Sequence, residues 1–480
     1  MKIKDQLHGI LNDLSAASTE STLLAGTFLL LIVGLMTKRV MVIKAVFALV
    51  LLLGIVVNLQ ISEEGYYLSS SLFLNQEILS FTSLLLIFGL MILIFPRKRH
   101  TPEFYFFTIS ILVGSTFLMK ANSLLMVYLS VELISFVSYI LTGFTFTKEG
   151  FEAGIKYLLF GAVSSAVMLV GLGLTYGTTG TFFISEWSAL LINQPLAELG
   201  FVFVMMGLFF KVSIFPFHGW TPATYQAAPV DSVALFSIVP KLAGLVLLRR
   251  IYNSLNFAFD HWLIYGVLIL GLLTILVGTL GALKQANTRR MVSFGSIAHS
   301  GFLLGFVLIP SGMSNEGAFW WYAVVYGLMN FGAFFLIAYF EASSIIRNDE
   351  YVRAKNERWV VVMFTLILVS LVGLPPLAGF TAKLFLFTSL WSIYLETGSV
   401  FEVLFLAGAI LATVASLFFY LRVPKTVFLN GIDQEPDNLA HPFSWKIKII
   451  ATIFGITMLM LFFAPELVMS LKSLLTNAHE

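Results

Sequence analysis

Long uncharged stretches recur along the whole chain, and they limit its possible folds more than any other feature does. The segment VFALVLLLGIVVNL, at residues 46–59, is one example. A helix needs about 20 apolar residues to cross a bilayer. Only 11% of the 480 residues are charged and 58% are hydrophobic, whereas a soluble protein carries about 25% charged residues. The sequence therefore predicts an all-α membrane protein that crosses the bilayer many times.

The length criterion of about 20 residues gives about fourteen spanning segments. Their approximate limits are 21–37, 40–60, 76–95, 103–120, 122–146, 152–177, 195–217, 230–252, 261–283, 291–310, 317–341, 359–395, 401–422 and 447–472. The twelfth is long because GLPPLAGF interrupts it, and proline removes a backbone donor and clashes with the preceding turn. Segment 182–192 is too short to span, and we expect it along the outer interface.

Loop charges predict the orientation, because cytoplasmic loops carry an excess of lysine and arginine. The basic residues that follow odd-numbered segments include Lys38, Arg39, Lys284, Arg289 and Arg290. Glutamates predominate after the even-numbered segments. We therefore expect the odd loops, with the polar connections 342–358 and 426–446, to be cytoplasmic and both termini to be outside. Lys120, Arg249 and Arg250 do not fit this pattern.

Several classes of function are excluded by composition and motifs. The chain has no cysteine, so it has no disulfide and no cysteine-ligated zinc or iron–sulfur cluster. Its seven histidines show no ligand spacing, and a net charge of +2 gives no sign of nucleic-acid binding. GLGLTYGTTG (171–180) lies within a helix and favours close helix packing rather than a dinucleotide site. We expect no bound cofactor or metal in this chain, and no redox or hydrolytic chemistry.

Two of the predicted helices are interrupted by proline. Lys211 precedes the break at Pro216, and Lys383 follows the break at 373–380. In lipid, such a break is tolerated only where the freed backbone is buried in protein or faces water. Broken helices at matching places in inverted halves indicate a transport site. The alternative is two proline-kinked helices that each carry a lysine with no role in transport.

The broken helices are the seventh and the twelfth, five apart, and an odd offset inverts the topology of the second copy. The reversed order of lysine and break in the two segments agrees with an inverted repeat. We therefore expect two inverted five-helix repeats, formed by segments four to eight and nine to thirteen. The predicted parts of this single membrane domain are 1–102, 103–253, 261–425 and 426–480.

Four ionisable residues lie inside apolar segments: Glu132, Lys211, Lys241 and Lys383. An isolated charge in a medium of low dielectric is so costly that the group usually neutralises or pairs. A paired glutamate and lysine can hold or release a proton according to the charge of their neighbours. The four residues therefore predict a proton path. The alternative is a set of static ion pairs that fix the helix register.

Three further residues are secondary candidates. Lys156 lies a few residues into its helix, so it could either join the path or extend to the lipid headgroups. His218, at the first break, could relay protons or bond to freed backbone groups. His299 stands between Ser296 and Ser300, as a hydrated polar path would require. Each histidine could equally be a satisfied core residue.

The stretch KVSIFPFHGWTPATYQAAPVDSVALFSIVPKLAGLVLLRR (211–250) resembles the antiporter-like membrane subunits of respiratory complex I and their relatives in multisubunit Na⁺/H⁺ antiporters. VELISFVSY, QANTRRMVSFGSIAHSG and GLPPLAGFTAKLFLF resemble further motifs of that family, so the likeness covers nearly the whole chain. TPATYQAAP and VPK are most similar to the N type. The M type has a glutamate where Lys383 stands, and the L type continues into a long lateral helix.

This resemblance implies a proton-translocating subunit of NADH:quinone oxidoreductase, in a bacterial inner (plasma) membrane. Glu132 and Lys211 would form an input pair, Lys241 would connect across the centre, and Lys383 would be the exit lysine. NADH, FMN, iron–sulfur clusters and quinone would lie in partner subunits. The partners would be the M-type, K-type and neighbouring small subunits and the lipid bilayer, with no nucleic acid. Arg289 stands where related N subunits often have lysine.

Two other functions stay open at this point. The chain could be a subunit of a standalone multisubunit Na⁺/H⁺ antiporter, which is a secondary transporter. It could also be a structural membrane subunit that has lost pumping, although all four charged sites are retained.

Overall fold

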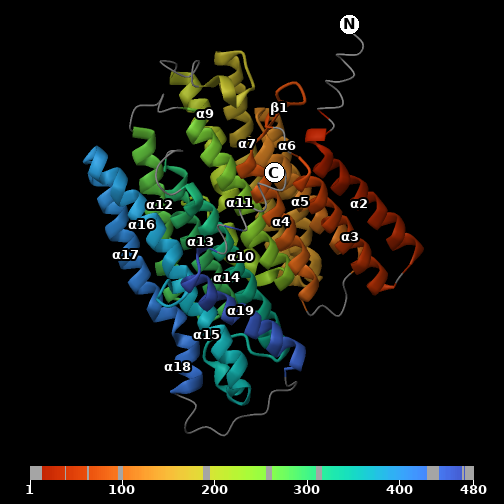
Figure 1. The fold of residues 1–480 in the computed structure, drawn as a ribbon, viewed down its shortest axis with the longest axis vertical. Helices are drawn as coiled ribbons and strands as arrows, with labels where there is room; N and C mark the ends of the chain where they lie inside the picture. Colours follow the sequence, from red (N-terminus) through yellow and green to blue (C-terminus); the bar gives the residue numbers. More distant parts are fainter. Residues whose placement is uncertain are drawn as a thin grey trace. The chain divides into compact units, whose positions relative to one another are not determined.

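The structure is a computed structural model that describes residues 13, 15–37, 39–61, 64–95, 101–187, 195–255, 262–309, 316–429, 443–466 and 470. These residues are almost all helical, which confirms the predicted all-α membrane class (Figure 1). Two compact units divide the chain. Unit 1 holds the described residues up to Val212 together with those of 239–255 and 470. Unit 2 holds residues 213–238 and the described residues from 262 to 466.

Unit 1 is built from long helices and one small β-hairpin. The hairpin pairs β1 (Gly65–Tyr67) with β2 (Leu72–Leu74) in antiparallel register. The helices are α2 (Ser18–Met36), α3 (Val40–Leu59), α4 (Gln76–Met91), α5 (Pro102–Lys120), α6 (Leu124–Thr142), α7 (Lys148–Thr179), α9 (Pro195–Val212) and the second part of α11 (Val230–Ser254). Short 3-10 turns are η1 (Ile92–Ile94), η2 (Gly143–Thr145) and η3 (Ile184–Glu186).

Unit 2 begins with the first part of α11 and a short helix that follows the first break. Its helices are α10 (Trp220–Ala227), α12 (Trp262–Leu283), α13 (Thr288–Val307), α14 (Glu316–Ala342), α15 (Arg358–Val372), α16 (Ala378–Thr397), α17 (Val400–Tyr420), α18 (Arg422–Phe428) and α19 (Trp445–Phe463). The 3-10 turn η4 (Glu350–Glu357) leads directly into α15.

Each of the fourteen predicted segments coincides with helix, and α15 and α16 together make up the twelfth. Among the described residues, thirteen helices are long and apolar enough to cross a membrane. The more polar α13 and the short α15 fall outside that set. Three limits were wrong: α9 ends at Val212 rather than 217, α7 is longer than predicted, and α19 ends at Phe463. Residues 188–194, most of which belong to the predicted interface segment 182–192, and residues 430–442, within the predicted loop 426–446, lie outside the described residues.

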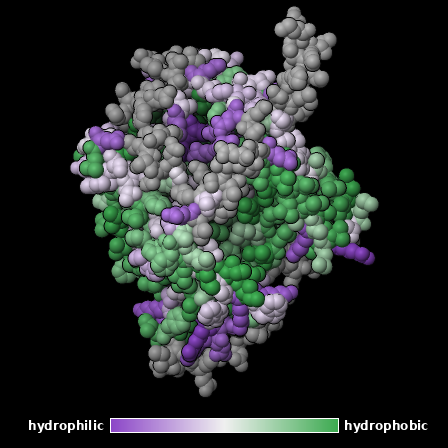
Figure 2. All heavy atoms as spheres, in the orientation of Figure 1, coloured by the Kyte–Doolittle hydropathy of each residue, from purple (hydrophilic) through white to green (hydrophobic). Residues whose placement is uncertain are grey.

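Large apolar side chains are exposed along α2 and α3, which lie side by side in Figure 1. Figure 2 shows a broad hydrophobic surface over these helices. The exposed residues include Phe28, Ile32, Leu35, Leu49, Leu53 and Val56. A monomeric soluble protein rarely exposes so large a contiguous apolar surface. This face is therefore suited to lipid or to another membrane helix.

Three cations that did not fit the predicted loop charges are held inside unit 1. Lys120 forms an ion pair of 2.9 Å with Glu20, and neither side chain is exposed to solvent. Arg249 lies 3.7 Å from Glu77. Arg250 donates to the carbonyl of Ala121 at 3.1 Å. These side chains make contacts inside the protein, so they do not count as free loop charges.

The two breaks share one backbone pattern. Ser213 follows α9 with a φ of +66°, and Gly373 follows α15 with a φ of +87°. Both are left-handed conformations that glycine adopts most readily. A proline stands three residues further on in each case, at Pro216 and Pro376. The shared pattern supports an internal repeat, and the predicted repeat boundaries stay a prediction.

The order of lysine and break does not support the inversion, contrary to the sequence interpretation. Copies of a repeat run in the same chain direction, even when their topology in the membrane is inverted. Lys211 lies just before the end of α9, whereas Lys383 lies eleven residues after Val372. The two lysines therefore occupy different positions relative to the shared backbone pattern. The reversed order of lysine and break is not evidence for an inverted repeat.

Gly379 allows α16 to start against the last turn of α15. A Cβ atom at this position would lie only 1.7 Å from the backbone oxygen of Ser370. The Gly379 amide donates to the Ser370 hydroxyl at 3.1 Å. A side chain would push the two half-helices apart, because the obstructing atom belongs to the backbone.

We predict that Gly379→Ala destabilises the protein by about 1–3 kcal/mol, the usual cost of overpacking. The measurement is the thermal midpoint of the detergent-solubilised protein. Gly173→Ala is the matched control, since no atom lies within 4 Å of a Cβ built there. It should leave the midpoint unchanged or raise it, because alanine is the better helix former. An unchanged midpoint in Gly379→Ala would contradict the close approach.

We predict that Glu20→Gln costs about 3–5 kcal/mol, because it leaves the buried ammonium of Lys120 without its counter-charge. The double variant Glu20→Gln/Lys120→Met should recover most of that loss, since it removes the orphaned charge as well. Thermal midpoints of the three proteins make the comparison. Equal losses in the single and double variants would show that the carboxylate does not compensate the lysine.

Candidate functional site

Lys211 lies in the last turn of α9 and is 1% exposed. Its ammonium donates to the Ser135 hydroxyl at 3.2 Å and to the Tyr157 hydroxyl at 3.4 Å. It also lies 5.7 Å from the centre of the Tyr157 ring. Among the described residues it forms no ion pair with a carboxylate. The hydrogen-bond partners that α6 and α7 offer to this buried cation are thus neutral hydroxyls.

Glu132 lies on α6, one turn before Ser135, and its side chain is partly buried. Residues three apart on a helix share a face. Its carboxylate accepts a hydrogen bond from Ser165 of α7. The resemblance predicts a Glu132–Lys211 pair, but the structure places no direct contact between them. Ser135 contacts the lysine instead, and Glu132 lies one turn away from that contact on the same helix.

Tyr139 completes this group of polar side chains in unit 1. Its ring packs edge-on against Tyr157, with centroids 4.7 Å apart. We call Glu132, Ser135, Tyr139, Tyr157, Ser165 and Lys211 the Lys211 cluster. All six come from α6, α7 and α9, and two of the predicted site residues belong to it.

Lys241 follows Pro240 inside α11 and is 1% exposed. Proline in a helix leaves a backbone carbonyl without its usual donor. In the most apolar 18-residue stretch of α11, 94% of the residues are buried. The structure thus confirms that Lys241 is buried, and its role as a central link stays a prediction.

Lys383 lies on α16 and is 4% exposed. Its ammonium donates to the carbonyl of Val372 at 2.7 Å and to the Thr413 hydroxyl at 3.3 Å. It lies 4.4 Å from the centre of the Phe302 ring. Val372 is the last residue of α15, and the final carbonyls of a helix lack internal partners and carry partial negative charge. The break in the twelfth segment therefore supplies the oxygen that holds this lysine.

His299 lies on α13 and is 3% exposed. Its Nε2 atom lies 3.2 Å from the carbonyl of Leu371, and its Nδ1 atom lies 2.8 Å from the Tyr322 hydroxyl. A carbonyl only accepts, so Nε2 carries a proton and donates to Leu371, while Nδ1 is hydrogen-bonded to the Tyr322 hydroxyl. His299 and Lys383 thus bind adjacent carbonyls of the same helix end.

Further hydroxyls extend this polar region within unit 2. Ser296 and Tyr326 are hydrogen-bonded at 2.9 Å, and Tyr326 donates to the carbonyl of Ser237 at 2.6 Å. The buried hydroxyl of Tyr420 has no hydrogen-bond partner in the part of the chain that the structure describes. We call His299, Ser296, Tyr322, Tyr326 and Lys383 the Lys383 network.

The other two secondary candidates join neither group. The half-buried ring of His218 stacks on Phe215 at 5.7 Å, and its Nδ1 atom has no partner among the described residues. The side chain of Lys156 is 57% exposed and pairs with Glu152 one turn earlier. Its neighbour Tyr157 faces Lys211, so Lys156 lies on a different face of α7. The structure therefore places Lys156 outside the cluster.

Arg289 corrects a sequence interpretation. We counted it among the basic loop residues on the cytoplasmic side, where a solvated side chain is expected, but it is only 9% exposed. Its Nε atom donates to Glu341 of α14 at 2.8 Å, and its Nη1 atom donates to the carbonyls of Gln226 and Ala228 at 3.0 and 2.8 Å. Arg289 thus ties the end of α10 to α13 and α14. A surface anchor would have remained solvated, so that interpretation was wrong.

Sequence reasoning missed the carboxylates Glu20 and Glu341. Glu341 stands at the last position of a predicted segment, where it looks like an ordinary loop residue. Glu20 lies just before the predicted start of the first segment at 21, although α2 begins at Ser18. Lys120, which did not fit the loop-charge pattern, was the available signal for Glu20, since a buried cation needs a partner.

No group of three or more histidine, aspartate or glutamate side chains within the described residues could hold a metal ion. The candidate site consists of the Lys211 cluster in unit 1, where hydroxyls contact the ammonium, and the Lys383 network in unit 2. Hydroxyl, imidazole and ammonium groups in hydrogen-bonded contact can exchange protons.

The family model described as NADH:quinone oxidoreductase/Mrp antiporter matches residues 121–410. NADH-quinone oxidoreductase subunit N of Wolbachia sp. subsp. Brugia malayi is 31% identical over 96% of this chain and 98% of that protein. NADH-quinone oxidoreductase subunit N 2 of Rhizobium meliloti is 30% identical, with coverage of 89% of this chain and 90% of that protein.

Solved structures share the fold. A chain of respiratory complex I from Thermus thermophilus with bound aureothin superposes with a TM-score of 0.77 at 25% identity, covering 94% of this chain and 98% of that one. A chain of the Mrp complex from Dietzia sp. superposes with a TM-score of 0.81 at 19% identity, covering 97% and 98% of the two chains. Motifs, fold and family model agree, and the chain belongs to the NADH:quinone oxidoreductase/Mrp antiporter family of membrane proteins.

Proposed function

We propose that this chain is a proton-translocating membrane subunit of NADH:quinone oxidoreductase. Protons would cross through Glu132, Lys211, Lys241 and Lys383 in response to redox chemistry in other subunits. The observation that carries the proposal is that the buried ammonium groups of Lys211 and Lys383 have uncharged hydrogen-bond partners. Lys211 faces two hydroxyls, and Lys383 faces a carbonyl and a hydroxyl.

Neutral partners allow a buried lysine to exchange its proton. When Lys120 loses a proton, it leaves the buried charge of Glu20 uncompensated, which is strongly unfavourable. Lys211 and Lys383 have uncharged hydrogen-bond partners, so neither breaks an ion pair when it loses its proton. The static ion-pair interpretation thus fits Lys120–Glu20 and Arg289–Glu341, and it does not fit these two lysines.

Glu132 is the group that could set the charge state of Lys211. While it is ionised, its negative charge stabilises the ammonium, since attraction across a medium of low dielectric is strong. Protonation of Glu132 removes this attraction, and Lys211 can then release its proton. Ser135 and Tyr157 are the hydroxyls placed to receive or pass that proton. Charge switching of this kind keeps the path from opening to both sides at once.

The exit step would belong to Lys383, as the family resemblance implies. Val372 and Thr413 orient its ammonium, and His299 binds the neighbouring carbonyl. The two ring nitrogens of His299 can donate and accept hydrogen bonds at opposite ends of the imidazole, which makes it a fitting relay beside the lysine. The connection from Lys211 to Lys383 through Lys241 is carried over from the family.

Other parts of the proposal rest on the resemblance and on the relatives. NADH, FMN, iron–sulfur clusters and quinone would be bound by partner subunits, and M-type, K-type and small membrane subunits would be the neighbours. The chain would lie in a bacterial inner membrane with both termini outside. The two inverted five-helix repeats, 103–253 and 261–425, belong to the same proposal.

We predict that Lys211→Ala abolishes most NADH-driven proton uptake by the reconstituted complex. The reason is that the residue that holds the proton next to Glu132 is gone. Lys156→Ala is the matched control, because Lys156 is exposed and paired only with Glu152. It should pump at the wild-type rate. Unchanged turnover and unchanged proton uptake in Lys211→Ala would overturn the assignment of that residue.

An assay in the same liposomes distinguishes the proposed function from that of a Na⁺/H⁺ antiporter subunit. We expect NADH-driven proton uptake to persist in Na⁺-free buffer. We also expect this chain to co-purify with a flavoprotein that oxidises NADH. A Na⁺ gradient imposed without NADH should move no protons. Proton movement driven by Na⁺ alone would favour the antiporter.

A further inference from the structure

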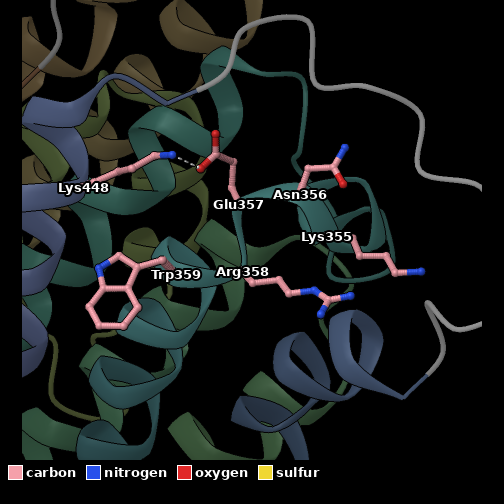
Figure 3. Close-up of a pocket in the computed structure, with 6 residues that line it drawn as sticks. All are labelled: Lys355, Asn356, Glu357, Arg358, Trp359 and Lys448. Atoms are coloured by element: carbon pink, nitrogen blue, oxygen red, sulfur yellow. Dashed lines mark ion pairs between the residues drawn. The ribbon is translucent and has the colours of Figure 1, made fainter.

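A basic cavity of about 340 Å³ lies where α15 and α19 begin. Figure 3 shows its lining side chains, which all belong to unit 2. They are Lys355, Asn356, Glu357, Arg358, Trp359 and Lys448. None of them takes part in the Lys211 cluster or the Lys383 network, so the cavity is a separate feature of the molecule.

The lining carries three positive charges and one negative charge, a net charge of +2. The side chain of Glu357 is only 8% exposed, pairs with Lys448 at 2.8 Å and accepts the Phe443 amide at 3.2 Å. Its oxygens are thus engaged with the protein. Arg358 is exposed and makes no hydrogen bond or ion pair with another described residue. In Figure 3 the side chains of Arg358 and Lys355 extend in the same direction.

Trp359 places the cavity at the edge of a bilayer. It is 54% exposed, and its indole N–H donates to Thr452 of α19 at 2.8 Å. Tryptophan is enriched at the membrane–water interface, where its ring stays apolar and its N–H stays bonded. The loop charges predict that this end of α15 and α19 is cytoplasmic.

A stripe of exposed apolar side chains runs along α19 from the cavity. Its members are Trp445, Ile449, Ile453, Ile456, Met460 and Phe463. Their spacing of three or four residues puts them on one helix face. Lys448, which lines the cavity, is next to the start of this stripe. A basic cavity followed by an apolar stripe has the same order of chemistry as a phospholipid.

We propose that the cavity binds the phosphate group of an anionic membrane phospholipid, whose acyl chains lie along the α19 stripe. Arg358 presents a planar fork of donors that suits phosphate oxygens, and Lys355 adds a second cation. Basic pockets between helices on the cytoplasmic side are suited to anionic headgroups. Free phosphate would use the cations but not the stripe, so a lipid is the occupant that both features fit.

The test uses the whole complex in phosphatidylcholine vesicles that contain an increasing fraction of phosphatidylglycerol with a photoactivatable acyl chain. After illumination, labelling within residues 445–463 is measured by peptide mass spectrometry. We expect Lys355→Gln/Arg358→Gln to raise the half-saturating lipid fraction about thirtyfold, since each cation near an anionic lipid contributes roughly fivefold. Arg39→Gln, an exposed arginine outside the cavity, is the matched control and should shift it less than twofold.

Three results would overturn the proposal. They are equal labelling of α19 in the wild type and the double variant, an equal shift in Arg39→Gln, and displacement of the label by inorganic phosphate. Unlabelled phosphatidylglycerol should compete with the label, and phosphatidylcholine should not. NADH oxidation by the double variant should match the wild type, which shows that the complex has folded and separates this proposal from proton transfer.

Discussion

The cost of burying a charge among apolar helices governs the polar interior of this protein. Two solutions occur side by side in unit 1. Lys120 is matched by the carboxylate of Glu20 at 2.9 Å, and no solvent reaches either side chain. Lys211 is just as buried but is surrounded by hydroxyls. The first arrangement fixes two helices and resists loss of a proton. In the second arrangement no carboxylate is ion-paired to the ammonium, which favours the proton exchange that we propose.

A broken helix provides the third way to hold a cation. The end of α15 exposes carbonyls that an unbroken helix would have used internally. Val372 and Leu371 offer theirs to Lys383 and His299. The break is stable only because α16 can start very close to it, and Gly379 supplies the space. Arg289 repeats the device at the end of α10, where it binds the carbonyls of Gln226 and Ala228. There a carboxylate, Glu341, also neutralises it.

Apolar runs were enough to predict the helices, since lipid leaves a long uncharged segment few alternatives. Isolated charges within those runs pointed to Glu132, Lys211, Lys241 and Lys383, and the structure confirms that the three lysines are buried. The sequence could not predict which of these side chains contact each other. Glu132 and Lys211 are on different helices, and only their packing decides that Ser135 stands against the lysine. Glu20 and Glu341 were missed because a carboxylate at a segment end looks like a loop residue until its partner is seen.

The positive charges of the chain therefore divide into distinct roles that composition alone cannot separate. Lys120, Arg249, Arg250 and Arg289 are structural, because each is bound by a carboxylate or by backbone carbonyls. Once these are removed from the count of loop charges, the bias of basic residues toward the odd loops becomes sharper. Arg358 then stands out among the remaining loop cations, because it lines a basic cavity and has no partner among the residues that the structure describes. A cation kept at a membrane edge without an internal counter-charge is available to an external anion, and the lipid headgroup is the anion that the membrane itself provides.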